Sequence, residues 1–262
     1  MHVIADTHVH VYPRFVCAGL FSSISARMDR LAGGKEHVNA LFLAERRDCN
    51  WFRDARAGNF DRRDQYSVEL PAGDANTVVI SGRGMSPLYV MAGRQIATSE
   101  RLEVLALLCD ADLPDGKPVV DIIRAVFDCG GLPVLAWAPG KWSLGRSSIV
   151  EKLVEAGVPG MLLVGDSAIR PQSWREPFLM RKARNRGLTI LCGTDALPLA
   201  AEEQYIGTYC SAWDGEFDPL RPSLSMRQVL TSANSHIEQA GGRCNTLAAL
   251  WRLMRLRVAG GR

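Results

Sequence analysis

From residue 104 onward, short apolar runs alternate with longer segments in which apolar residues recur every three or four positions. We predict strands at 104–109, 132–138, 160–165 and 188–193, and helices at 117–129, 147–156 and 177–186. The strand segments are apolar at nearly every position, which indicates that both of their faces are buried. This alternation is typical of repeated β-α units around a parallel sheet.

The first hundred residues add strands at 3–11 and 39–44, a helix after Phe15 and a short helix after Asp48. Residues 60–103 differ, because Gly, Pro and Asp separate three short predicted strands at 66–70, 77–80 and 88–91. We therefore expect an α/β fold: a TIM-like barrel of seven or eight β/α units with a β-rich insertion around residues 60–103. The whole chain, 1–262, is expected to form one such domain, with a helical extension at about 224–262.

Composition narrows the class of protein. The chain has 262 residues, 47% of them hydrophobic, and a net charge of only +3 from 31 basic and 28 acidic residues. A balance this even gives no reason to expect nucleic acid as a partner, and we expect a small anionic substrate instead. Seven scattered cysteines without a Cys-x-x-Cys pair, and the lack of any apolar run of transmembrane length, predict a cytoplasmic protein that does not bind membranes.

The segment Asp6-Thr7-His8-Val9-His10 carries the most specific chemistry in the chain. In a strand, alternate side chains share a face, so Asp6, His8 and His10 are predicted to point the same way. Two imidazoles and a carboxylate on one face can hold a divalent metal ion, and zinc, manganese and iron all suit such ligands. The alternative is a strand end whose histidines only hydrogen-bond to their neighbours.

Polar residues also follow the later predicted strands, where the ends of parallel strands bring side chains together. Asp195 follows the last strand and is a candidate metal ligand or catalytic base, while Asp166 has the same position one strand earlier. Lys141 and Arg170 are candidate cations for a phosphate or carboxylate group. Each residue has an ordinary alternative, helix capping for the aspartates and a solvated loop charge for the cations.

The C-terminal segment 246–258 combines large apolar residues at helical spacing with three arginines. A basic amphipathic helix of this kind can bind acidic membranes or anionic partners. We interpret the segment as the last helix of the barrel.

In their order along residues 3 to 200, four motifs resemble those of the polymerase and histidinol phosphatase (PHP) family of metal-dependent phosphoesterases. Asp-Thr-His-Val-His at 6–10 is similar to the first motif of the family. The segments at 92–107, 132–139 and 193–197 are similar to the second, third and fourth motifs. The resemblance implies a distorted amidohydrolase-like barrel and a cluster of metal ions.

The match keeps the framework and loses much of the family's ligand set. Gln95, Glu103, Trp137 and Leu197 stand where the family has a glutamate and three histidines. His8, His10 and Asp195 remain as matched ligands, with Asp6, Glu103 and Asp166 nearby as further carboxylates. The resemblance therefore implies one divalent metal ion in this chain instead of three.

Three functions follow from these patterns. The first is a metal-dependent, phosphoesterase-like hydrolase in which Asp195 or Asp166 orients a metal-activated water and Lys141 and Arg170 hold an anionic substrate. The second is a catalytically degenerate PHP-like barrel that binds a ligand or partner. The third is a metal-independent lyase or isomerase that uses Lys141.

Overall fold

A computed structural model describes residues 1–15, 19–59, 66–232 and 235–260. The strands are β1 (His2–Val9), β2 (His37–Leu43), β3 (Ser67–Glu69), β4 (Thr77–Ser81), β5 (Leu88–Met91), β6 (Gly93–Ala97), β7 (Glu103–Leu107), β8 (Leu132–Ala136), β9 (Leu163–Ser167), β10 (Ile190–Gly193), β11 (Tyr209–Asp214) and β12 (Glu238–Gly241). The helices are α1 (Leu20–Leu31), α2 (Trp51–Arg56), α3 (Val119–Asp128), α4 (Arg146–Ala156), α5 (Phe178–Asn185), α6 (Pro222–Thr231) and α7 (Thr246–Gly260), with 3-10 turns at Pro13–Phe15 and Glu202–Tyr205.

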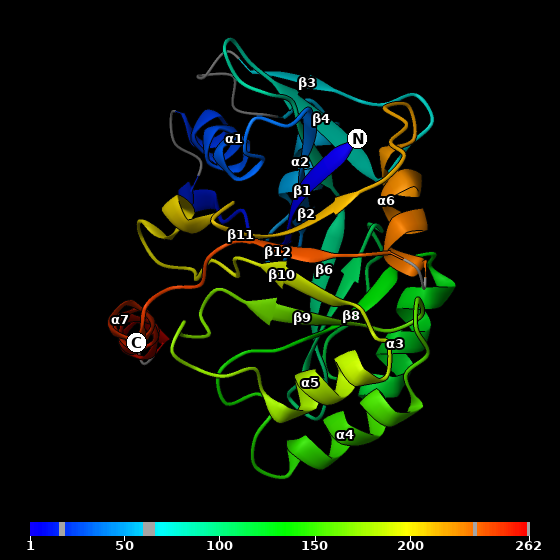
Figure 1. The fold of residues 1–262 in the computed structure, drawn as a ribbon, viewed down its shortest axis with the longest axis vertical. Helices are drawn as coiled ribbons and strands as arrows, with labels where there is room; N and C mark the ends of the chain where they lie inside the picture. The colour runs from blue at the N-terminus through cyan, green and yellow to red at the C-terminus, as the bar shows by residue number, and fades with distance from the viewer. Residues whose placement is uncertain (16–18, 60–65, 233–234, 261–262) are drawn as a thin grey trace.

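The described strands form two open sheets and not one closed barrel. One sheet has seven strands in the order β12-β11-β1-β2-β5-β4-β3, and the other has five in the order β10-β9-β8-β7-β6 (Figure 1). Several neighbours, among them β1 and β11, β6 and β7, and β7 and β8, run antiparallel. The expectation of a TIM-like barrel was therefore wrong, because apolar runs report which strands are buried but not in which direction neighbouring strands run.

The two sheets pack against each other through a shared apolar core. Phe42 and Met91 of the first sheet meet Leu105, Val134 and Leu191 of the second in one buried cluster. Helices α3, α4 and α5 cover the outer face of the five-stranded sheet, and α1 packs on the seven-stranded sheet (Figure 1). A backbone bridge between Glu45 and Arg94 links the end of β2 to β6.

Local sequence explains the helix boundaries in this scaffold. In α3 the buried side chains of Val119, Ile122 and Val126 recur at helical spacing and pack on the five-stranded sheet. The Glu100 carboxylate accepts a hydrogen bond from the Val119 N–H, which satisfies a free donor at the start of the helix. Gly130, at φ 73°, follows the last turn in the left-handed conformation that ends helices.

The segment at 60–103 is confirmed as rich in strands, at least over residues 66–97. β3, β4 and β5 extend the seven-stranded sheet, whereas β6 pairs with β7 in the other sheet.

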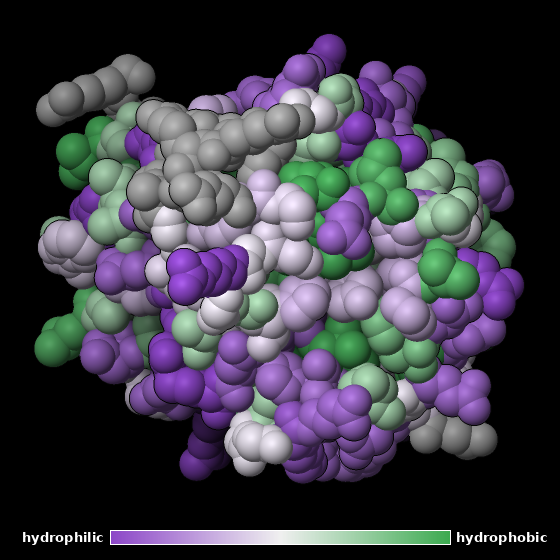
Figure 2. All heavy atoms as spheres, turned by 90° about the horizontal axis from the view of Figure 1, so that it is seen from above, coloured by the Kyte–Doolittle hydropathy of each residue, from purple (hydrophilic) through white to green (hydrophobic). Residues whose placement is uncertain are grey.

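On the face seen in Figure 2, apolar side chains lie scattered among polar ones. No helix in the described part of the chain is both long enough and apolar enough to span a membrane.

Candidate metal centre

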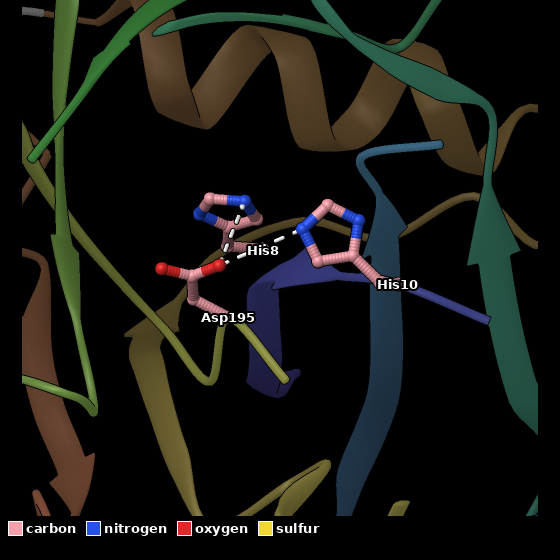
Figure 3. A group of neighbouring side chains, drawn as sticks. All are labelled: His8, His10 and Asp195. Atoms are coloured by element: carbon pink, nitrogen blue, oxygen red, sulfur yellow. Dashed lines mark ion pairs between the residues drawn. The ribbon is translucent and has the colours of Figure 1, made fainter. Parts of the chain in front are cut away.

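His8, His10 and Asp195 meet where the C-terminal end of β1 lies beside the end of β10. One nitrogen of each imidazole and one oxygen of the carboxylate all lie within 4.8 Å of one another. In Figure 3 a single carboxylate oxygen of Asp195 faces both rings. His8 and His10 are buried, and the Asp195 side chain is only 14% exposed.

The backbone around β10 fixes this arrangement. The Asp195 N–H donates to the His8 carbonyl at 2.9 Å, and the Thr7 hydroxyl donates to the Cys192 carbonyl at 3.0 Å. A Cβ on Gly193 would lie 2.5 Å from the backbone nitrogen and the Cβ of His8. Only glycine permits this approach, which brings the carboxylate that follows β10 to the histidines of β1.

The distances between the donors fit a shared metal ion better than a hydrogen bond. Nε2 of His8 and Nε2 of His10 each lie 3.6 Å from Asp195 Oδ1, beyond hydrogen-bond range. Two ligands bound to one tetrahedral ion at ~2.0–2.1 Å lie about 3.3–3.4 Å apart. The three side chains therefore fit a divalent metal ion in both chemistry and spacing.

The electrostatic surroundings favour the protonation states in which Asp195 and His10 can bind a metal ion. Burial raises the pKa of Asp195, but His8 and His10 outweigh this effect and hold that pKa well below its usual value. Burial lowers the pKa of His10, so its imidazole is neutral at neutral pH. A carboxylate and a neutral imidazole are the forms that bind metal.

A second set of residues orients these three side chains. The Ser167 hydroxyl, at the end of β9, donates to Asp195 Oδ2 at 3.0 Å. The Tyr12 ring stacks on the His10 ring with their centroids 5.4 Å apart. Gln95 acts differently, because its Oε1 lies 3.0 Å from His8 Nε2, the same nitrogen that faces Asp195. Sequence reasoning gave no role to Ser167 or Tyr12, although Tyr12 continues the alternation of Asp6, His8 and His10 by one step.

The remaining predicted carboxylate ligands lie in other hydrogen-bond networks. The Asp6 carboxylate accepts hydrogen bonds from Thr194 and from the Gly207 N–H. Burial raises the pKa of Asp6 to about 6, although these hydrogen bonds oppose the shift. A shift in register of β1 between Asp6 and Val9 explains why Asp6 does not join the histidines, because it interrupts the strict alternation.

The predicted substrate cations are each paired with a carboxylate. Lys141 Nζ lies 2.8 Å from Glu103 Oε1. Glu103 is not one of the three clustered ligands, although its carboxylate acts on the pKa of His10. Arg170 binds Asp166 through two nitrogens, and the Tyr209 hydroxyl donates to the same carboxylate at 2.7 Å. The sequence had suggested Lys141 and Arg170 as partners of an anionic substrate and Asp166 as a residue that orients water. In the structure, ion pairs balance the charges of all three side chains.

A cavity of about 620 Å³ opens beside the cluster. Gln95 contacts His8 and also lines this cavity, together with Arg46, Arg47, Asp48, Ala97, Glu103 and Asp115. Arg46 and Arg47 follow β2, and they line the chamber together with three carboxylates, those of Asp48, Glu103 and Asp115. Arg46 Nε lies 3.6 Å from Asp48 Oδ1, so a polar chamber with charges of both signs lies next to the candidate ligands.

No protein family model matches the sequence, and no curated protein matches it. Several solved structures are similar in fold, among them those of two proteins named PsfC and PfuEndoQ. PsfC from Pseudomonas syringae PB-5123 aligns with a TM-score of 0.53 and 16% identity over 98% of this chain and 97% of its own. The lesion-specific endonuclease PfuEndoQ from Pyrococcus furiosus aligns with a TM-score of 0.53 and 11% identity, over 92% of this chain and 59% of its own.

The likeness is one of fold. Because one of these folds belongs to an endonuclease, our exclusion of nucleic acid from the net charge was wrong. Net charge averages over the whole surface and does not report local clusters such as Arg46 and Arg47 beside the cavity.

Proposed function

We propose that the protein is a metal-dependent hydrolase of phosphoesters. The observation that carries the proposal is the cluster of His8, His10 and Asp195, whose donor atoms lie within 4.8 Å of one another. A divalent ion held by these residues would supply Lewis-acid activation of water and of a phosphoryl oxygen. The likeness in fold to an endonuclease supports phosphoester chemistry, and it includes DNA among the substrates worth testing.

The surrounding residues have complementary roles in this proposal. Ser167 holds Asp195 in orientation, and Tyr12 packs against His10. Burial is the main reason that the pKa of Tyr12 is raised, so its hydroxyl stays protonated and can donate a hydrogen bond. Arg46 and Arg47 line the adjacent cavity beside three carboxylates, and their guanidinium groups would bind the anionic phosphoester.

A second candidate is a protein that binds a ligand without catalysis. The observation that favours it is Gln95, whose side-chain oxygen lies 3.0 Å from His8 Nε2, the same atom that would bind the metal. A hydrogen bond at this atom competes with coordination. The two candidates differ in whether reconstituted protein turns over a phosphoester.

The test is hydrolysis of p-nitrophenyl phosphate, bis-p-nitrophenyl phosphate and DNA oligonucleotides after reconstitution with zinc, manganese or iron. We expect turnover of at least one substrate, and a loss of about a hundredfold or more in kcat/KM for Arg46→Gln with Arg47→Gln. Arg83→Gln, an exposed arginine outside the cavity, serves as the matched control. Metal bound without turnover of any substrate would favour the second candidate.

A further inference from the structure

Helix α7 presents a stripe of large apolar side chains to the outside of the molecule. Each is more than half exposed, and they recur at helical spacing: Leu247, Leu250, Trp251, Met254 and Val258. We call these five residues the outer stripe. In Figure 1 α7 lies at the periphery, outside both sheets. Large apolar side chains gathered in this way mark an interaction surface.

The opposite side of α7 is firmly held by the body of the protein. The buried Arg252 guanidinium donates to the Glu202 carboxylate at 2.6–3.0 Å and lies 4.3 Å from the centre of the Tyr205 ring. Leu253 and Leu256 pack against a small apolar cluster on the body. The exposure of the outer stripe therefore follows from specific docking of the other face.

The segment that carries the outer stripe is cationic. Residues 239–262 contain five arginines and no aspartate or glutamate. At ~100° per residue, Arg255 and Arg257 lie on opposite flanks of the stripe. The Arg255 guanidinium lies 4.4 Å from the centre of the Trp251 ring. An apolar strip between two cationic flanks is complementary to a partner that is apolar inside and anionic at its surface.

The length and charge of α7 distinguish between the possible partners of the outer stripe. A second copy of the chain would bring two arginine-flanked stripes together, and neither segment holds a carboxylate to compensate them. Nucleic acid would satisfy the arginines but would leave the aliphatic side chains in water. The helix has 15 residues, or about 22 Å, which is too short to cross a hydrocarbon layer of ~30 Å and fits an orientation along its surface.

We propose that the outer stripe of α7, with Arg255 and Arg257 at its flanks, binds an anionic lipid surface. Trp251 and the aliphatic side chains enter the boundary between headgroups and acyl chains, while the arginines remain at the headgroups. The site is separate from the candidate metal centre, and the proposal does not depend on the hydrolase function.

The experiment is co-sedimentation of the full chain with two vesicle preparations. One is phosphatidylcholine alone, and the other contains about a third phosphatidylserine. We expect binding to the anionic vesicles, weakened by salt, and little binding to the neutral ones. The Arg255→Gln, Arg257→Gln variant should partition about thirtyfold less onto the anionic vesicles. The Trp251→Ser, Met254→Ser variant should lose at least about tenfold.

Matched controls separate the outer stripe from general surface properties. Leu144→Ser with Leu220→Ser removes two exposed apolar side chains elsewhere, and Arg83→Gln with Arg124→Gln removes two exposed arginines. Both controls should bind like the unaltered chain. Absence of binding to anionic vesicles, or equal binding by the α7 variants, overturns the proposal. If the unaltered chain forms a dimer and the Trp251→Ser, Met254→Ser variant is a monomer, the outer stripe binds a second copy of the chain and the proposal is overturned.

Discussion

Gly193 shows how one residue decides whether the candidate metal centre forms. Its missing side chain lets the end of β10 approach His8, and the hydrogen bond from the Asp195 N–H to the His8 carbonyl then holds the two segments together. Asp195 itself has a positive φ of 52°, an uncommon conformation that this backbone hydrogen bond helps to maintain. Close packing and strain at this point bring the carboxylate to the two imidazoles.

We expect Gly193→Ala to reduce metal affinity by at least about tenfold, because a Cβ at 2.5 Å from His8 must displace the strand. We also expect it to lower the free energy of unfolding by about 1–3 kcal/mol. Metal titration and urea unfolding measure the two effects. Gly165→Ala in neighbouring β9 is the control, since its Cβ would meet a side-chain carbon of Val134 at 3.3 Å. Unchanged metal affinity in Gly193→Ala would contradict this role.

The sequence predicted part of the candidate site at this scale. The Asp-Thr-His-Val-His segment and Asp195 were singled out because their residue types and strand-end positions suit metal ligands. The irregularity in β1 that turns Asp6 toward Thr194 leaves no mark in the alternation of residue types. Lys141 pairs with Glu103, which lies 38 positions earlier in the chain. This contact depends on how β7 and β8 pair, so it could not be predicted from the sequence either.

At the scale of elements, a buried carboxylate holds the start of α2. Glu45 follows β2 and accepts hydrogen bonds from the backbone N–H groups of Trp51 and Phe52. Burial raises the pKa of Glu45 to about 7, although Arg94 and these hydrogen bonds oppose the shift. The folded chain therefore binds more protons at Glu45 than the unfolded chain does between pH 4.5 and about 7.

Because of this difference, stability contributed at Glu45 falls as the pH rises through that interval. We expect the free energy of unfolding of the unaltered chain to fall, relative to that of Glu45→Gln, by on the order of 2–3 kcal/mol between pH 4.5 and 7.5. Urea unfolding at a series of pH values measures it. Glu36→Gln, at an exposed position, should show no such difference. If the free energy of unfolding changed with pH in the same way in Glu45→Gln and in the unaltered chain, a raised pKa of Glu45 would be ruled out.

The attachment of α7 depends on the buried pair of Arg252 and Glu202, each side chain about 1% exposed. Arg252→Met leaves the Glu202 carboxylate buried without its partner, so we expect a loss of about 3–5 kcal/mol in the free energy of unfolding. Adding Glu202→Gln should recover much of that loss, because no unpaired charge remains. Arg257→Met, in the exposed part of the same helix, should have little effect. Equal losses in the single and double variants would show that the unpaired Glu202 charge is not the cause of the loss. A loss of less than about 1 kcal/mol in Arg252→Met would show that other contacts hold α7.

At the scale of the whole molecule, many of the individual strands and helices could be predicted from the sequence, but the way in which the strands pair could not. Strands β4, β5, β8, β9 and β10 and helices α3, α4 and α5 were predicted close to their observed positions, since each has a continuous apolar run or a helical period. The barrel was not correct, because the direction of each strand depends on pairing between distant segments such as β1 and β11. β6, β11 and β12 were not predicted; β12 in particular is short and largely exposed.

The central claim is that this fold brings His8, His10 and Asp195 together to bind one divalent metal ion. The most direct measurement is the metal content by plasma mass spectrometry of protein reconstituted with zinc, manganese or iron and freed of excess metal. We expect near-stoichiometric metal in the unaltered chain and in His2→Ala with His236→Ala, which removes histidines paired elsewhere. We expect no retained metal in His8→Ala with His10→Ala. Equal metal in all three proteins, or none in any of them, would contradict the claim.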